Sequence, residues 1–149
     1  MKAEQGIKHE FVDFIPDILE EGKIYISMDF ATAAHKCPCG CGSEVITPFS
    51  PTDWKLTFDG NSISLSPSIG NWNFGCQSHY WIRNNKVIMS RKWSKERIDA
   101  GRFQDKMNKQ HYFDRTSKPA RGDSVVHSER KIDGEIIRGN FWSRLKKLF

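Results

Sequence analysis

Residues 35–42 have the sequence His-Lys-Cys-Pro-Cys-Gly-Cys-Gly, which contains three of the four cysteines in this chain of 149 residues. Cys37, Cys39 and Cys41 are too close together to form several unstrained disulfides. The proline and glycines between them favour tight turns that direct neighbouring thiolates to one point. A tetrahedral zinc ion, which takes four such ligands, explains this crowding. With the distant Cys76 as fourth ligand, the stretch predicts a structural zinc (Zn²⁺) that ties two parts of the fold together.

Two histidines lie near the cysteines, so the sequence leaves the ligand set open. His35 lies two residues before Cys37, and Cys76 and His79 have the spacing of a ligand pair. His35 is either a ligand or a hydrogen-bond donor to one. Four thiolates are the favoured set, and they would leave no open position for a metal-bound water, which disfavours a catalytic zinc. The six candidate ligands are His35, Cys37, Cys39, Cys41, Cys76 and His79.

The composition indicates a soluble globular domain. Hydrophobic residues make up 38% of the chain and charged residues 28%, and the mean hydropathy is −0.61. No apolar run is long enough to cross a bilayer, and the first ten residues lack the apolar core of a signal peptide. We therefore expect a cytoplasmic protein, in which disulfides are rare.

Charge divides the chain near residue 90. Residues 1–90 contain 7 Lys and Arg against 10 Asp and Glu, whereas residues 91–149 contain 16 against 8. A basic region does not by itself indicate nucleic acid, and no nucleic-acid-binding motif accompanies it, so no nucleic-acid partner is expected. We expect a β-rich zinc-binding domain with the candidate active site over residues 1–90 and a basic extension over residues 91–149.

Alternating apolar residues predict strands in the first of these two parts. Asp59-Gly60 and Asn84-Asn85 predict hairpin turns. A rough helical spacing predicts a short helix within residues 1–22, and small or turn-forming residues predict loops at 31–34 and 67–71. The predicted strands are 23–28, 44–47, 54–58, 62–66, 80–83 and 86–90.

The second part has one clear helix signal. Ser94 predicts the cap of a helix that continues to about residue 110. A polar linker is expected over 114–134, and residues 141–149 form a short amphipathic segment that could contact a membrane surface, a partner or its own domain. The expected fold class is α+β: a small, mostly antiparallel β domain with a cysteine-rich zinc site, plus a helix and a basic C-terminal extension.

If the cysteines bind the metal, His79 is free for acid–base chemistry. A serine becomes a nucleophile when a neutral imidazole can take its proton, so Ser68 and Ser78 are candidates. Neighbouring residues of a strand face opposite sides, which makes Ser68 the better partner and Ser78 the alternative. Most such Ser and His pairs are structural, so the pattern alone does not establish catalysis.

Other polar groups could complete such a site. Glu44 or Asp53 could orient His79, and the backbone near Gly70 or the amide of Asn71 could stabilise an oxyanion. Aromatic residues could line a substrate groove, but in a small β domain they are more often core. The aromatic residues in question are Trp54, Trp72 and Trp81.

Three runs of residues together resemble one bacterial family. The runs are 35–42 (HKCPCGCG), 64–72 (SLSPSIGNW) and 76–82 (CQSHYWI). The family is catalogued as a domain of unknown function and accompanies ubiquitination-like (Bub) operons. Those operons also encode a ubiquitin-like protein and relatives of ubiquitin-activating and ubiquitin-conjugating enzymes, which the resemblance implies as partners. The resemblance covers about residues 23–90.

The resemblance implies a serine-type, deubiquitinase-like peptidase that cleaves after the C-terminal tail of the ubiquitin-like protein. Carried onto this chain, Ser68 becomes the nucleophile and His79 the base, Ser78 remains the alternative nucleophile, and the cysteines hold their loops in place. The alternative is a non-catalytic zinc-binding module that interacts with the ubiquitin-like protein or its conjugating enzyme. The basic extension lies outside the resemblance.

Overall fold

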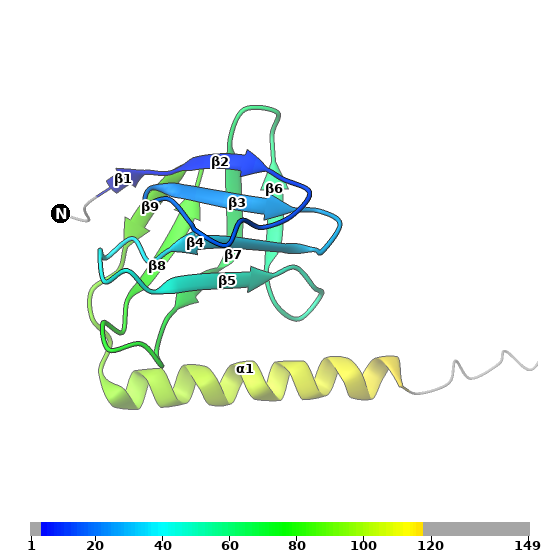
Figure 1. Cartoon of the computed structure of the whole chain (residues 1–149). Coiled ribbons are helices and arrows are strands. Elements are labelled where there is room, and N and C mark those ends of the chain that lie inside the picture. Colours follow the sequence, from blue (N-terminus) through cyan, green and yellow to red (C-terminus); the bar gives the residue numbers. More distant parts are fainter. Residues whose placement is uncertain (1–3, 118–149) are drawn as a thin grey trace, which may run out of the picture. The chain divides into compact units, whose positions relative to one another are not determined.

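Two β-sheets lie face to face in the computed structural model, which describes residues 4–117 (Figure 1). One sheet has five antiparallel strands in the order β1-β9-β8-β7-β6, and the other has the order β2-β3-β4-β5, where only the β2–β3 pair is parallel. The expected mostly antiparallel fold is thus confirmed. The strands are β1 (Glu4–Gly6), β2 (Lys8–Phe11), β3 (Lys23–Ser27), β4 (Thr32–Lys36), β5 (Glu44–Pro48), β6 (Lys55–Phe58), β7 (Ile63–Gly70), β8 (His79–Arg83) and β9 (Lys86–Met89).

The core forms between the sheets from alternate strand residues. Ile24 and Ile26 of β3 meet Leu65 of β7 and Ile82 of β8 in one buried cluster. Alternation along each strand places these side chains on the inner face, where they leave water. Cys37, just after β4, belongs to the same cluster and is 3% exposed. The first cysteine is therefore anchored in the core.

The prediction of a short helix within residues 1–22 is wrong. This segment contains β1 and β2, which pair with β9 and β3, followed by irregular chain. Its apolar residues serve a different purpose: Leu19 packs on Tyr25 and Ala34 and covers the outer face of the four-stranded sheet. Strand pairing provides the backbone partners at the start of the segment, and Pro16 would interrupt a helical hydrogen-bond ladder.

The predictions of loops at 31–34 and 67–71 are also wrong, since most of these residues belong to strands. Residues 32–36 form β4, where Ala33 is fully buried between β3 and β5. Residues 67–70 continue β7, whose pairing with β8 is irregular between Leu65 and Ile69. A bulge of this kind lets a strand bend without losing its partner. Tertiary pairing outweighs the weak strand propensity of Ala, Pro and Gly at these positions.

The predicted hairpins and the remaining strands are confirmed. Asn84 and Asn85 have φ angles of +48° and +58°, which fit a tight turn between β8 and β9. This turn fixes the register that pairs Tyr80 with Met89. As a result β8 and the chain before it, from Cys76 onward, lie at a defined position beside β7.

Helix α1 (Lys95–Thr116) follows the last strand and is longer than expected. The Ser94 hydroxyl caps it by accepting a hydrogen bond from the Arg97 backbone N–H. Ile98 is its one buried residue. No helix within residues 4–117 is long and apolar enough to cross a membrane. The linker expected over 114–134 is wrong at its start, because residues 114–116 are the last residues of α1. The linker residues beyond 117 and the amphipathic segment 141–149 lie outside the described residues.

We predict that Gly101→Ala makes α1 more stable. Gly101 lies inside the helix, and an added Cβ would meet Trp93 at 3.6 Å, an ordinary contact. Replacing an interior helical glycine by alanine is worth about 0.5–1 kcal/mol. Amide hydrogen exchange along α1 should slow in Gly101→Ala and quicken in the matched Ala100→Gly. Faster exchange in Gly101→Ala would contradict this assignment.

Candidate functional site

The four cysteines converge on one point. Their sulfur atoms all lie within 4.8 Å of one another. Cys37 Sγ lies 3.3 Å from Cys39 Sγ and 3.9 Å from Cys76 Sγ, and Cys41 Sγ lies 3.7 Å from Cys76 Sγ. Four sulfurs around a tetrahedral zinc at about 2.3 Å would be separated by about 3.8 Å. The cluster could therefore hold a metal ion.

The loop that contains Cys37, Cys39 and Cys41 has the backbone that such an arrangement needs. Gly40 and Gly42 have φ angles of +87° and +79°, in the left-handed region that favours glycine. Hydrogen bonds from Ser43 lower the pKa of the Cys41 thiol to about 6, which favours the thiolate that a metal binds. Burial raises the pKa of Cys37 instead, so this thiol would depend on a metal to lose its proton.

A polar network behind Cys37 connects the cluster to β8. Ser78 Oγ lies 3.0 Å from Cys37 Sγ and accepts a hydrogen bond of 2.9 Å from the Asn71 side-chain amide. The same amide reaches the Tyr80 hydroxyl, which is 2.8 Å from His35 Nε2. Ser78 thus contacts a sulfur atom of the cysteine cluster on one side and the Asn71 amide on the other. Asn71, considered above as an oxyanion donor, has its amide committed to this network.

His35 lies in the core and not in the cysteine cluster. Its ring is fully buried, and burial lowers its pKa to about 4, so it is neutral at physiological pH. The group of possible metal ligands found within residues 4–117 consists of the four cysteines alone. The two histidines that competed for ligand positions are therefore elsewhere in the structure.

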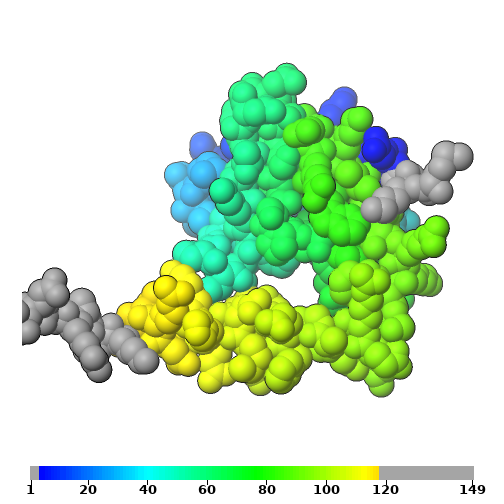
Figure 2. Space-filling model, turned by 180° about the vertical axis from the view of Figure 1, so that it is seen from behind, coloured from blue at the N-terminus to red at the C-terminus, as the bar shows by residue number. Residues whose placement is uncertain are grey.

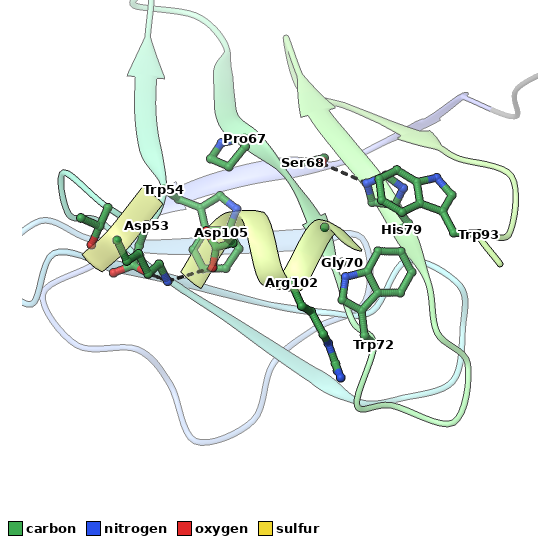
Figure 3. A pocket seen from close by; sticks show the side chains of 13 residues that line it. Asp53, Trp54, Pro67, Ser68, Gly70, Trp72, His79, Trp93, Arg102 and Asp105 are labelled. Carbon is green, nitrogen blue, oxygen red and sulfur yellow. Dashed lines mark hydrogen bonds and ion pairs between the residues drawn. The ribbon is translucent and has the colours of Figure 1, made fainter. Parts of the chain in front are cut away.

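Ser68 and His79 form a close pair on neighbouring strands. Ser68 Oγ of β7 and His79 Nε2 of β8 are hydrogen-bonded at 2.9 Å (Figure 3). The bulged end of β7 brings the serine beside β8, where Gly70 pairs with His79. Ser78, the other candidate, points toward Cys37. The structure thus brings Ser68 to His79 and directs Ser78 away, as expected for neighbouring residues in extended chain.

Three tryptophans surround the His79 ring. The ring centroids of Trp72, Trp81 and Trp93 lie 5.2, 5.0 and 4.3 Å from that of His79. Trp72 also stacks on Trp93 and covers Gly70, where a Cβ would approach the indole to 2.5 Å. Such packing restricts the orientation of the imidazole. These three tryptophans therefore belong to the site, whereas Trp54, the other tryptophan considered above, packs against the main core cluster.

No carboxylate orients His79 within the described residues. Its Nδ1 atom is buried without a hydrogen-bond partner. Asp53, one expected partner, accepts from Ser50 and from Lys109 instead, and Glu44 is exposed on β5. Burial, and after it the charge of Arg97, lowers the pKa of His79, so its ring is mostly neutral at pH 7. A neutral ring is the form that can accept a serine proton.

Ser68 and His79 line a pocket of about 330 Å³ that lies between the strands and α1 (Figure 3). Its size is typical of clefts that bind ligands. Trp54, Trp72 and Trp93 give it apolar walls, and residues of α1 line the opposite side. Figure 2 shows the opening between α1 and the strands. Residues that could react thus lie where a ligand could reach them.

The part of the site that follows residue 90 was not predicted from the sequence. Trp93 packs against His79, and Arg97 lies over the Trp93 ring at 4.2 Å. A Trp directly before a helix cap, followed by an Arg in the first turn, was the available signal, since a residue at this position often packs against the start of the helix. The excess of basic residues after residue 90 suggested an extension outside the site, so Trp93 and Arg97 were not considered as site residues.

A family model described as "Bacterial ubiquitination-like system serine protease (BubE)" matches residues 11–90. The match contains all four cysteines, Ser68 and His79, and it ends before Trp93 and α1. The comparison with curated proteins and the comparison with solved structures gave no match. Because the family model covers more than half of the chain, this chain belongs to the family of bacterial ubiquitination-like system serine proteases.

Proposed function

We propose that this chain is a peptidase that hydrolyses the bond after the C-terminal tail of a ubiquitin-like protein. The family name supports a serine protease of a ubiquitination-like system. The observation that carries the proposal for this chain is the 2.9 Å contact between Ser68 Oγ and His79 Nε2 at the wall of a pocket. Cleavage at this position would mature a precursor or release the modifier from a target.

In the proposed reaction Ser68 Oγ attacks the carbonyl carbon while His79 Nε2 takes its proton. The tetrahedral intermediate then collapses, and His79 gives the proton to the leaving amine. Water hydrolyses the resulting acyl-enzyme with the same base. The aromatic packing around His79 would perform the orienting role that a carboxylate has in a triad, since Nδ1 has no partner here.

We propose that the cysteine cluster binds one structural zinc ion. The sulfur separations fit a tetrahedral ion, and the donor set of four thiolates suits zinc. When bound, zinc would tie the loop after β4 to Cys76. Cys76 lies three residues before His79, so the ion would fix the start of β8 and with it the position of the base. All chemistry on the substrate is assigned to Ser68 and His79.

We predict that Ser68→Ala abolishes cleavage and retains zinc. Loss of a serine nucleophile lowers kcat by about 10⁶-fold in serine proteases. The assay uses the ubiquitin-like protein with a C-terminal extension and measures the masses of the products. Ser66→Ala, a change at an exposed serine two residues away on β7, is the matched control and should cleave normally. Stoichiometric binding without turnover by the wild-type chain would instead support the non-catalytic module.

We predict that Ser78→Ala lowers the affinity for zinc but leaves the cleavage activity of the zinc-loaded chain largely intact. Loss of a hydrogen bond to a ligand typically reduces metal affinity by about 10- to 100-fold. Competition with a chromophoric chelator measures this affinity, and metal analysis of the wild-type chain should give about one zinc per chain. Cleavage by zinc-loaded Ser78→Ala should persist. If this variant is inactive while Ser68→Ala cleaves normally, the nucleophile is Ser78.

We predict that the acidic limb of the pH profile lies below the ordinary pKa of histidine, near 6.5. Burial and Arg97 both favour the neutral ring of His79, so the base stays active as pH falls through that value. Arg97→Gln removes a positive charge and should move the acidic limb of kcat/KM toward higher pH. Arg115→Gln, at the far end of α1, is the control. A limb that moves to lower pH in Arg97→Gln would contradict the assignment of the base.

A further inference from the structure

Helix α1 forms the outer wall of the pocket that contains Ser68. The residues that line it are Gly101, Arg102, Asp105 and Lys109. Gly101, Asp105 and Lys109 follow one another at intervals of four residues, which places them on one face of the helix. This face is directed at Ser68, Trp54 and Trp72 across the pocket (Figure 3).

Polar contacts, rather than a packed apolar interface, hold the helix over the pocket. Arg102 donates a hydrogen bond of 2.6 Å to the Asn73 side chain, and two turns later Lys109 forms an ion pair of 2.9 Å with Asp53. Between these two contacts no residue of α1 is buried. The helix therefore bridges the β domain and leaves a passage beneath it, which Figure 2 shows from behind.

One edge of β7 is free in this passage. The ladder between β6 and β7 ends with the pair Lys55 and Ser66, whereas β7 continues to Gly70. Within residues 4–117, no strand pairs with β7 beyond Ser66 on the side of β6. Pro67, Ser68 and Gly70 line the pocket along this stretch. An unpaired edge offers backbone groups to a peptide that binds as an additional strand.

Gly101 keeps the passage open opposite this edge. The fold does not need a glycine here, because a Cβ would only touch Trp93 at 3.6 Å and an interior glycine weakens a helix. Gly101 lines the same pocket as Ser68 and Trp72, so a larger side chain at this position would reduce the space at the Trp93 wall of the pocket. Near the other end of the pocket, Lys109 forms ion pairs with Asp53 and Asp105, so these charges are already paired in the structure.

We infer that α1 is the outer wall of the substrate groove, and that the groove takes an extended peptide as an added strand on the free edge of β7 beneath Gly101. This inference rests on the proposed peptidase function and assigns a role to residues outside the family match. It requires the bond that is cut to lie in an unfolded segment, since a folded surface cannot enter beneath the helix. The apolar walls of Trp54, Trp72 and Trp93 would contact the side chains of that segment.

The first test compares Gly101→Leu with Ala100→Leu, a neighbouring exposed position that does not line the pocket. For the ubiquitin-like protein with a C-terminal extension, we expect kcat/KM to fall at least about tenfold in Gly101→Leu and to stay within about twofold in Ala100→Leu. A small fluorophosphonate, which needs only Ser68 and His79, should label both variants at the wild-type rate. Failure of the wild-type chain to be labelled at Ser68 would count against the proposed function itself.

Unchanged or faster cleavage by Gly101→Leu would overturn the inference, since the helix would then be irrelevant to the substrate or act as an inhibitory cover. Equal loss of labelling and cleavage would overturn it as well, because the substitution would then act on the serine–histidine pair.

The second test uses the wild-type chain and so does not depend on the folding of a variant. The substrates are peptides that span the cleavage site, each with one backbone nitrogen methylated on the side before the cut bond. A strand paired along one edge directs alternate amides to its partner. We expect methylation at alternate positions to slow cleavage strongly and methylation between them to have little effect. Equal tolerance at every position would overturn the inference.

Discussion

The alternation of side chains at the start of β8 is the constraint on which the site depends. Ser78 points to Cys37 Sγ at 3.0 Å, while its neighbour His79 points the other way to Ser68 Oγ at 2.9 Å. Extended chain places neighbouring side chains on opposite sides, so a single strand end serves both the cysteine cluster and the candidate reaction pair. The backbone bond from Asn71 N–H to the Ser78 carbonyl fixes the same point against β7.

Through this arrangement the cysteine cluster would affect the position of His79, although the cysteines themselves take no part in the proposed reaction. Cys37 belongs to the buried core and Cys76 to the chain that leads into β8. An ion held by both would join the core to the strand that carries the imidazole, through a segment of three residues. The aromatic rings of Trp72, Trp81 and Trp93 then hold the imidazole from three directions. In the proposed mechanism this packing replaces a carboxylate that this part of the chain does not provide.

Much of this site was predictable from local sequence, because close cysteines and hairpin turns are local signals. The crowding of Cys37, Cys39 and Cys41 pointed to a cluster with Cys76, and Asn84-Asn85 pointed to the turn that sets the position of β8. The strand rule also favoured Ser68 over Ser78 as the partner of His79. These predictions needed only spacing and backbone preference.

The rest depends on tertiary contacts that spacing does not encode. The segment before β3 looked helical because its apolar residues cover the outer face of a sheet, and β4 looked like a loop because its alanines pack between two strands. The contribution of α1 was missed because its charges suggested an appendage, whereas its polar contacts with Asn73 and Asp53 hold it over the pocket.

In the proposed mechanism Ser68, activated by His79, is the nucleophile. Mass mapping of the residue that a fluorophosphonate modifies in the zinc-loaded chain of 149 residues tests this assignment. The serine oxygen attacks phosphorus, fluoride leaves, and the proton passes to the base, so the adduct marks the activated serine. We expect one adduct, on Ser68, which disappears in His79→Gln. An adduct on Ser78, or labelling of Ser68 that does not depend on His79, would contradict it.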